Sequence, residues 1–428
     1  MSFPLPLPAD LAGWLAYIEA LHPKAIAMGL DRVNIVKNKL NLNPTVPVVI
    51  VGGTNGKGST CAMLERIYHE AGYKVGCYTS PHLLRYNERV RLSCKEISDE
   101  ALCKAFTKVE QARANTELTY FEFGTLAAVS YFVESDVDVM ILEVGLGGRL
   151  DAVNVFEPAS AIVVSVDLDH MDFLGNTKES IGFEKAGIFR SGITAICGER
   201  EPPLSLIQHA LEIGAELKAI GNQFDAVIDD KGWTFHSDNK ALEHFALPAL
   251  TGEFQADNAA CVIEAINALS TTLPVSDEII HKGLQLVSLA GRFQKVGDQP
   301  EIILDVAHNP HAAQALARNL SMLAPKRTLA VFGMLADKDI AGVLSNLISQ
   351  IDAWYLADIH HIRGASANEL LQFVRTGNDP KIAGLFTNVC DALTQACLDA
   401  AENDRIIVFG SFFTVADAMH ALSAINQD

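Results

Sequence analysis

The chain has 428 residues, 49% hydrophobic and 20% charged, which is the balance of an ordinary globular protein with about two or three domains. Its formal net charge of −19 excludes a broad basic face for nucleic acid, so an anionic ligand would need locally placed cations, amide dipoles or a metal. No apolar run approaches the ~18 residues of a membrane span, no signal peptide is recognisable, and eight cysteines without a C-x-x-C motif indicate a reduced, cytoplasmic protein.

The first predicted elements form a β-α-β unit. The β-branched run VPVVIV at 46–51 predicts a buried parallel strand. The glycine loop GGTNGKGST at 52–60 follows, and then an amphipathic helix that ends at Gly72. The run at 73–80 predicts the next strand. A loop between a strand and a helix is the context that a phosphate-binding loop requires.

The glycine loop differs from the usual pattern G-x-x-x-x-G-K-[ST], because Gly58 separates Lys57 from the hydroxyls of Ser59 and Thr60. Its backbone N–H groups, at the start of a helix, nevertheless favour an anion, and Lys57 adds a positive charge. The alternative is a turn that merely connects a strand with a helix. The flanking strand and helix favour a nucleotide phosphate.

Polar side chains follow the next strands. Ser80 lies in TSPHL after the second strand, and Glu143 ends an apolar strand predicted at 137–145. Ligands of parallel sheets bind beyond the carboxyl ends of the strands, where a buried carboxylate should face a cation such as Mg²⁺. The alternatives are a turn for Ser80 and a structural salt bridge for Glu143.

A second acidic segment follows the strand predicted at 159–167. It contains Asp167, Asp169, His170 and Asp172. Three carboxylates and an imidazole within six residues suggest a metal or catalytic corner, and a solvated acidic loop is the alternative. A histidine would be an unusual ligand for Mg²⁺, which prefers oxygen.

The remaining chain continues as α/β. A helical stretch between Glu184 and Phe189 contains Lys185, which by its sequence alone is a surface lysine. Strands near 301–305, 327–335, 352–359 and 405–412 alternate with helices and predict a smaller doubly wound domain. We therefore expect one domain at 1–290, a linker at about 289–300 and a second domain at 297–428. Asn309 should cap a helix that Pro310 begins.

Seven segments occur together in a specific order. They are GGTNGKGST, TSPHL, LEVGLGGRLDAVN, DHMDFLG, EKAGIF, GRFQ and DVAHNPHA. The set resembles the dihydrofolate synthase/folylpolyglutamate synthase family, within the ATP-dependent Mur ligases, over residues 21–419. The resemblance implies an α/β fold, with a P-loop-containing Mur-ligase-like ATP-binding domain followed by a smaller Rossmann-like domain.

The resemblance also implies roles for individual residues. For ATP, it implies contacts from Thr54, Asn55, Gly56, Lys57, Gly58, Ser59, Thr60, Asn258, Arg292 and Asp305. For two Mg²⁺ ions, it implies Ser80 and Glu143 at one site and His170 at the other. For the pterin substrate, it implies His22, Thr119, Tyr120, Phe121, Glu122, Leu150, Asp151 and Ala152. Lys57, Lys185 and His170 would be catalytic, with Lys185 carboxylated by CO₂ to a carbamate.

The implied activity is ATP-dependent addition of L-glutamate to dihydropteroate and to reduced folates, through an acyl phosphate. We expect the protein to be a monomer. One alternative is a folylpolyglutamate synthase that lacks the first activity; LTYFEFGT at 118–125 favours the bifunctional type. Another is a muramoyl-peptide ligase, although only about fifty residues precede the glycine loop, too few for a further domain. A third is a P-loop protein that hydrolyses ATP without ligation.

Overall fold

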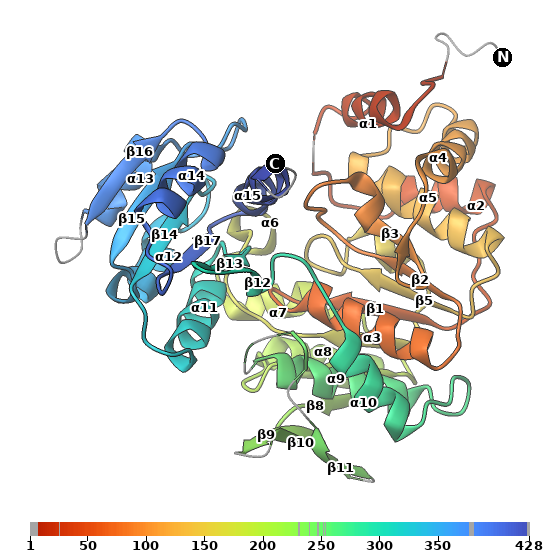
Figure 1. Ribbon diagram of the computed structural model, residues 1–428. Coiled ribbons are helices and arrows are strands. Elements are labelled where there is room, and N and C mark those ends of the chain that lie inside the picture. Colours follow the sequence, from red (N-terminus) through yellow and green to blue (C-terminus); the bar gives the residue numbers. More distant parts are fainter. Residues whose placement is uncertain are drawn as a thin grey trace. The chain divides into compact units, whose positions relative to one another are not determined.

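The computed structural model describes residues 7–24, 26–229, 232–238, 240–245, 248–250, 252, 254–375 and 381–425. The chain divides into two compact units, which are treated separately below (Figure 1). The first consists of Met1–Pro248 with Ala256–Val287, and the second consists of Ala249–Gln255 with Ser288–Asp428. No helix in the described ranges is long and apolar enough to cross a membrane.

The described part of the first unit contains an eight-stranded sheet in the order β4-β3-β2-β5-β1-β6-β7-β8. The strands are β1 (Val48–Gly52), β2 (Val75–Tyr78), β3 (Val90–Leu92), β4 (Lys95–Glu96), β5 (Val139–Glu143), β6 (Ser160–Val163), β7 (Thr194–Cys197) and β8 (Glu216–Ala219). Six of them run parallel, and β3 and β4 pair antiparallel at one edge. The four strands predicted up to residue 167 are confirmed, with β5 inserted between β1 and β2.

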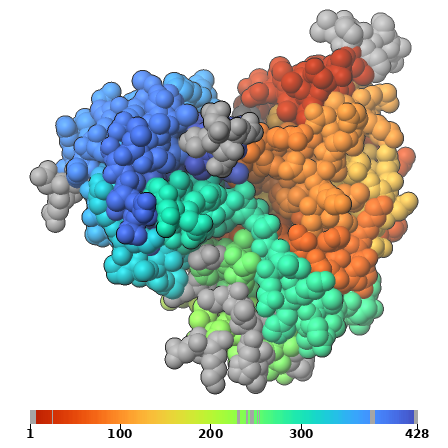
Figure 2. All heavy atoms as spheres, viewed as in Figure 1, coloured from red at the N-terminus to blue at the C-terminus, as the bar shows by residue number. Residues whose placement is uncertain are grey.

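Helices pack on the parallel strands or on one another. They are α1 (Leu11–Ala20), α2 (Asp31–Lys39), α3 (Lys57–Glu70), α4 (Asp99–Arg113), α5 (Tyr120–Glu134), α6 (Met171–Leu174), α7 (Lys178–Ala186), α8 (Leu204–Ile213), α9 (Phe254–Ala268) and α10 (Asp277–Leu286). Two 3₁₀ turns, η1 (Tyr86–Arg89) and η2 (Ala152–Val155), lie in connections. Figure 2 shows α10 beside α3, where a methyl group at Gly283 would lie 2.5 Å from Ile67.

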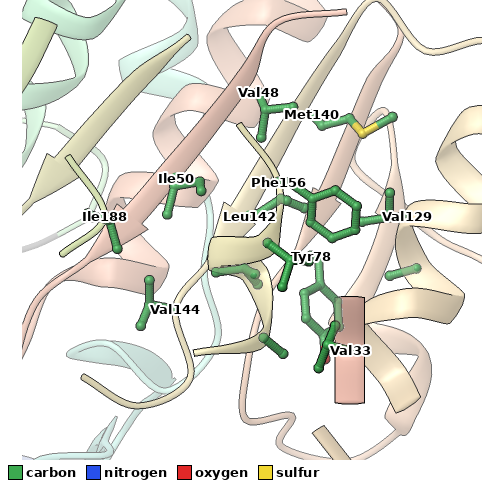
Figure 3. Packing of buried hydrophobic residues seen from close by; sticks show 14 of the residues in the cluster. Val33, Val48, Ile50, Tyr78, Val129, Met140, Leu142, Val144, Phe156 and Ile188 are labelled. Atoms are coloured by element: carbon green, nitrogen blue, oxygen red, sulfur yellow. The ribbon is translucent and has the colours of Figure 1, made fainter. Parts of the chain in front are cut away.

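Burial on both faces explains the uninterrupted apolar sequences of β1 and β5, since every residue of these strands is buried. Figure 3 shows Ile50 of β1 and Leu142 of β5 packed near Tyr78 of β2, with Val129 of α5 and Val33 of α2 beyond. This core holds the carboxyl ends of β1, β2 and β5 in fixed register, and the polar segments follow at those ends.

The structure differs from the expectation at two places in this unit. The helix expected between Glu184 and Phe189 is α7, which begins earlier, at Lys178. It begins there because Thr177 caps it: Thr177 Oγ1 accepts the N–H of Ser180 at 3.1 Å. The segment before α9 also contains an antiparallel sheet, which we did not predict. Its strands are β9 (Phe224–Asp229), β10 (Gly232–Ser237) and β11 (Lys240–Phe245).

The second unit is doubly wound, as expected. In its described residues the sheet order is β12-β13-β17-β14-β15-β16, parallel except for β12. The strands are β12 (Gln294–Asp298), β13 (Glu301–Asp305), β14 (Thr328–Phe332), β15 (Ala353–Ala357), β16 (Ile382–Phe386) and β17 (Arg405–Phe409). The helices are α11 (Pro310–Met322), α12 (Ile340–Leu347), α13 (Ala367–Val374), α14 (Val389–Asp399) and α15 (Phe412–Ile425), with the 3₁₀ turn η3 (Ile348–Gln350).

The predicted linker at 289–300 is partly wrong, because Gln294–Asp298 form strand β12 and pair antiparallel with β13. The sequence of β12 contains glycine and charged residues and no apolar run, because β12 is a mostly exposed edge strand. We therefore did not recognise it as a strand. Strand β16 was also not predicted. The predicted cap is confirmed: Asn309 Oδ1 accepts the N–H of Ala312 at 2.8 Å, and Pro310 begins α11.

We predict that Gly76→Ala destabilises the first unit by about 1–3 kcal/mol, because the added methyl group would lie 2.6 Å from the ring of buried Phe132. Urea unfolding should show the loss. In the double variant Gly76→Ala/Phe132→Leu, the smaller side chain should remove part of the clash, so the two single effects should not add. Strict additivity would contradict the proposed overlap.

Candidate functional site

The glycine loop lies between β1 and α3, and its backbone requires glycine. Gly53 and Gly56 have φ of +146° and +85°, and Gly56 is the residue before α3. A methyl group at Gly56 would lie 2.7 Å from Val164 Cγ1 and 2.8 Å from Asn258 Oδ1. The loop therefore passes close beneath the buried Asn258 side chain of α9, and a side chain at Gly56 would displace it.

Hydrogen bonds fasten this loop to the segment after β6. Thr54 N–H donates to Ser165 O at 2.9 Å, and Asn55 N–H donates to Ser165 Oγ at 3.0 Å. Thr54 Oγ1 donates to Asp167 O at 3.0 Å and accepts the N–H of Asp167 at 2.9 Å. These bonds hold the loop conformation before any ligand binds, so its helix-start N–H groups are already positioned for an anion.

Lys57 is the first residue of α3, and its ammonium turns back onto the loop. Lys57 Nζ donates to Gly53 O at 3.0 Å and to Thr54 O at 3.2 Å. One turn later, the buried hydroxyl of Thr60 has no hydrogen-bond partner in the described part of the chain. A phosphate group at the loop would offer the Lys57 ammonium stronger acceptors than these neutral carbonyl oxygens.

Glu143 and Ser80 lie together at the same edge of the sheet. Tyr78 of β2 pairs with Leu142 of β5, which brings the ends of both strands side by side. Ser80 N–H then donates to Glu143 Oε2 at 3.1 Å, and Glu143 is only 4% exposed. A buried carboxylate next to a hydroxyl is a donor set that suits Mg²⁺, which keeps several water ligands.

The acidic segment after β6 does not form a metal cage. Among the described residues, no three His, Cys, Asp or Glu side chains lie close enough to hold a metal ion. Asp172 is exposed, and Asp167 fastens the glycine loop through its backbone. His170 is also exposed, with φ +50°, and its Nε2 lies 3.9 Å from Asp169 Oδ2. The exposed side chains of this segment that have the chemistry of a metal ligand are thus His170 and Asp172.

Lys185 is not the surface lysine that the sequence suggested, because it is only 3% exposed at the last turn of α7. Burial lowers the pKa of its ammonium group to about 7, and the positive charge of Lys57 adds to the shift, while Asp169 opposes it. A substantial fraction of this amine is therefore neutral near pH 7. A neutral, buried amine near Lys57 can act as a nucleophile toward a small electrophile.

The residues expected around the pterin fall into one local group with a single exception. Thr119 caps α5, and Glu122 closes the cap and pairs with Arg32 at 2.8 Å. Phe121 lies against Gly145, where a methyl group would be 2.7 Å from its ring, and Tyr120 follows the Thr119 cap. His22 instead bonds within its own turn, where Nδ1 accepts the N–H of Lys24 at 3.0 Å, and the described residues show no bond from it to this group.

Asp151 organises the neighbouring loop. Its carboxylate accepts the N–H groups of Gly145, Leu146 and Val153 at 3.0, 2.9 and 3.1 Å. Burial raises the pKa of this carboxyl to about 7, against the lowering effect of the three N–H donors. Leu150 is half-buried and Ala152 is buried, on either side of Asp151. Because the Asp151 oxygens already accept backbone N–H groups, the parts of this loop that remain for a ligand are its backbone and the Leu150 side chain.

A cluster that we missed from the sequence lies between Ser80 and Tyr120. Arg89 Nε donates to His82 Nδ1 at 2.8 Å, and the Arg89 guanidinium lies 5.3 Å from the ring of Tyr86 and 5.6 Å from that of Tyr120. Burial, together with the Arg89 charge, lowers the pKa of His82 to about 4. The available signal was TSPHL followed by several arginines, but a sequence does not show which arginine meets the histidine.

In the second unit, the expected residues Arg292 and Asp305 lie close to each other, and His308 lies nearby. Asp305 accepts the N–H groups of Phe293 and Ala307, both at 2.8 Å. Burial raises its pKa to about 6, and the charge of Arg292 opposes the shift. The Arg292 guanidinium lies 5.5 Å from the ring of Phe412, which His308 also contacts, with ring centroids 6.1 Å apart.

Known families and structures match this chain along nearly its whole length. The Mur ligase middle domain matches residues 51–266, and the Mur ligase glutamate ligase domain matches residues 291–412. The dihydrofolate synthase/folylpolyglutamate synthase of Escherichia coli K12 is 46% identical over 419 residues, which are 97% of this chain and 96% of that protein.

Two solved structures are similar to this chain in both fold and sequence. E. coli FolC in complex with DHPP and ADP has a TM-score of 0.93 and 45% identity, over 99% of this chain and 100% of that chain. A bifunctional folylpolyglutamate synthase/dihydrofolate synthase with Mn, AMPPNP and L-glutamate bound has a TM-score of 0.90 and 43% identity, over 98% and 100%. The chain therefore belongs to the dihydrofolate synthase/folylpolyglutamate synthase family of ATP-dependent Mur-type ligases.

Proposed function

We propose that this ligase adds L-glutamate to dihydropteroate, forming dihydrofolate, and adds further glutamates to reduced folates, with ATP converted to ADP and phosphate. The observation that carries the proposal is the preformed phosphate loop next to a buried carboxylate. Val51, two residues before Gly53, pairs with Glu143 in the sheet. The relatives that bind DHPP, ADP, AMPPNP and L-glutamate support the identity of the substrates.

In the first step, an oxygen of the substrate carboxylate attacks the γ-phosphorus of ATP. The bond from that phosphorus to the β–γ bridging oxygen breaks, and ADP leaves an acyl phosphate behind. Negative charge spreads over the phosphoryl oxygens, so catalysis needs positioned N–H groups and cations. The loop from Thr54 to Thr60, and above all Lys57, would supply them. Asn258, which lies against Gly56, would contact the nucleotide from α9.

A divalent metal fits the donor set at the strand ends. Ser80 and Glu143 would hold one Mg²⁺ ion, and His170 would contribute to a second. When bound, the ions neutralise charge on the phosphates of ATP. Oxygen donors suit Mg²⁺ better than imidazole does, so the Ser80–Glu143 site has the stronger chemical support.

In the second step, the neutral amine of glutamate attacks the acyl carbon, an amide bond forms and inorganic phosphate leaves. An acyl phosphate hydrolyses readily, so water must be kept from it. We assign ATP contacts in the second unit to Arg292 and Asp305, which its local geometry holds together with Phe412. The amino-acid substrate would bind to this unit, since the glutamate ligase domain matches residues 291–412.

Lys185 would carry a carbamate. Its neutral nitrogen attacks the carbon of CO₂ and loses a proton, which converts a cation into an anion. Burial near Lys57 favours this change, because the resulting negative charge would lie near a cation, whereas an ammonium is repelled by it. The carbamate would orient the cations around the γ-phosphate.

The pterin would bind at Thr119–Glu122 and Leu150–Ala152, where Phe121 offers an aromatic surface against Gly145. His22 would join this pocket only if its turn moved. A cytoplasmic, monomeric enzyme without nucleic-acid or membrane partners remains our proposal; the eight cysteines, all within the described residues and all free thiols, support a reducing compartment.

The function is tested by supplying ATP, Mg²⁺ and L-glutamate with either dihydropteroate or a reduced folate, and weighing the products. Both acyl substrates should gain glutamate, and ADP release should depend on L-glutamate. Lys57→Ala should lower kcat/KM at least about 100-fold, because a cation at the transferring phosphoryl group is lost. Reaction with the folate alone would favour the monofunctional alternative. ADP release independent of L-glutamate would refute ligation.

The loop geometry is tested by Gly56→Ala. We expect ADP affinity, measured by calorimetry, to fall at least about tenfold, since the methyl group would displace Val164 and Asn258. Gly72→Ala is the matched control, because Gly72 also has positive φ, of +92°, but has no atom within 4 Å of the added methyl group. Both variants should lose about 1–2 kcal/mol of stability to backbone strain. Equal ADP affinity in the two variants would contradict the role of the loop.

The carbamate is tested by Lys185→Ala. Activity should fall about 100-fold and return in part with acetate, which can replace the missing carboxylate. The exposed Lys178 of the same helix provides a control variant, Lys178→Ala, that should not respond to acetate. In the unmodified enzyme at limiting CO₂, activity should rise as pH increases through about 7, because the neutral amine becomes more abundant. Acetate that leaves Lys185→Ala unchanged would count against the carbamate.

A further inference from the structure

The Arg89–His82 pair presents a set of N–H groups without acceptors. Because His82 Nδ1 accepts the Arg89 Nε–H, the imidazole is neutral and carries its proton on Nε2. In the described part of the chain, His82 Nε2 donates to no protein atom, and neither do the two terminal amino groups of Arg89. The pair therefore offers a charged fork and one further donor in a half-buried position.

Neighbouring arginines in the same connection form ion pairs with carboxylates, whereas Arg89 does not. Arg85 pairs with Asp99 at 3.2 Å and Arg91 pairs with Glu65 at 2.8 Å. Among the described residues, no carboxylate oxygen lies within ion-pair distance of Arg89. The carboxylate of the adjacent Glu88 is fully engaged, because it accepts the N–H groups of Leu83, Leu84 and Arg85, each at 2.7 Å.

The guanidinium is also fixed in place. Arg89 is the last residue of η1, its carbonyl accepts the N–H of Thr79 at 2.9 Å, and its side chain lies over Tyr86 and Tyr120. Like Lys57 and Lys185, Arg89 thus places a positive charge without a carboxylate partner among the described residues in a protein whose net charge is −19. Such an arrangement favours an anionic ligand with two acceptor oxygens, because a guanidinium fork binds a carboxylate bidentately.

The position of the Arg89–His82 pair suggests which carboxylate of the substrate it would bind. Along the site, Tyr120 beside the pterin pocket is followed by Arg89, then His82, and then Ser80, two residues away at the Ser80–Glu143 edge. Along a folate, the pterin is followed by the p-aminobenzoyl ring, the α-carboxylate of glutamate and the γ-carboxylate that reacts. The two orders agree when the α-carboxylate lies at Arg89 and His82.

We propose that Arg89 and His82 bind the α-carboxylate of the folate's glutamate residue while its γ-carboxylate is activated. The proposal rests on the proposed function and deepens it. Dihydropteroate has a single carboxylate, which must itself react, so it cannot use this subsite. The pair therefore recognises folates specifically, and the first ligation proceeds without it.

The test is the KM of each acyl substrate in Arg89→Met and in the control Arg85→Met. Arg89→Met should raise the KM for a reduced folate about 10- to 100-fold, because a charge-assisted bidentate bond is lost, and should change that for dihydropteroate less than about twofold. Arg85→Met should change neither. Arg89→Lys should recover only part of the folate affinity, since an ammonium is not a fork. If Arg89→Met raised the KM equally for both substrates, or raised neither KM, the proposal would be overturned.

A folate whose α-carboxylate is replaced by an amide gives an independent readout. The unmodified enzyme should bind this analogue about as weakly as Arg89→Met binds the natural folate, and Arg89→Met should not distinguish the two ligands. His82→Gln should retain more folate affinity than His82→Ala, because the glutamine amide can supply an N–H near the position of Nε2. Binding is measured by calorimetry, so variants without turnover still give an answer.

The inference and the proposed function fail in different ways. If the unmodified enzyme adds no glutamate to either acyl substrate, the proposed function fails. If it does add glutamate to the folate, and Arg89→Met discriminates the folate from its α-amide as well as the unmodified enzyme does, only the α-carboxylate subsite is refuted. Unfolding curves should show that Arg89→Met and Arg85→Met are both fully folded under the assay conditions, so that a KM change is not a loss of structure.

Discussion

The structure depends most on the hydrogen bonds that join the glycine loop to the segment after β6. Thr54 and Asn55 hold Ser165 and Asp167 through backbone and hydroxyl groups at 2.9–3.0 Å. Because these bonds exist without a nucleotide, the loop is already ordered, and ATP binding does not lose free energy to ordering it. They also connect two strand ends, so that the loop, Glu143 and the segment with His170 belong to one rigid edge of the first unit.

Local placement of charge resolves the conflict between an acidic protein and anionic substrates. The overall charge is −19, yet Lys57, Lys185 and Arg89 all lie in the connections at the carboxyl ends of the first unit's strands or on helices that start there. Each is held differently: Lys57 by loop carbonyls, Lys185 by burial, and Arg89 by tyrosine rings and His82. Short-range donors in a partly buried setting outweigh a distant surface field that salt screens.

Much of this edge could be predicted from the sequence. Apolar strands that end in Ser80 and Glu143 belong to a parallel sheet, and parallel strands place their carboxyl ends together. The glycine loop was visible because its glycines and lysine are local features. Lys185 was misjudged because its burial depends on how α7 packs against the 145–149 loop, where Arg149 N–H donates to Glu184 O at 2.8 Å. The Arg89–His82 pair was missed for the same reason, since only tertiary structure shows which arginine lacks a carboxylate. Strand β12 was missed because an exposed edge strand carries little hydrophobic signal.

The central claim is that this edge activates a carboxylate by transferring the γ-phosphoryl group of ATP to it. The most direct measurement uses an acyl substrate whose reacting carboxylate carries ¹⁸O, with analysis of the inorganic phosphate by mass spectrometry after amide formation. We expect one ¹⁸O atom per phosphate, because the acyl carbon–oxygen bond breaks when the glutamate amine displaces phosphate. Amide formation with unlabelled phosphate would contradict the account.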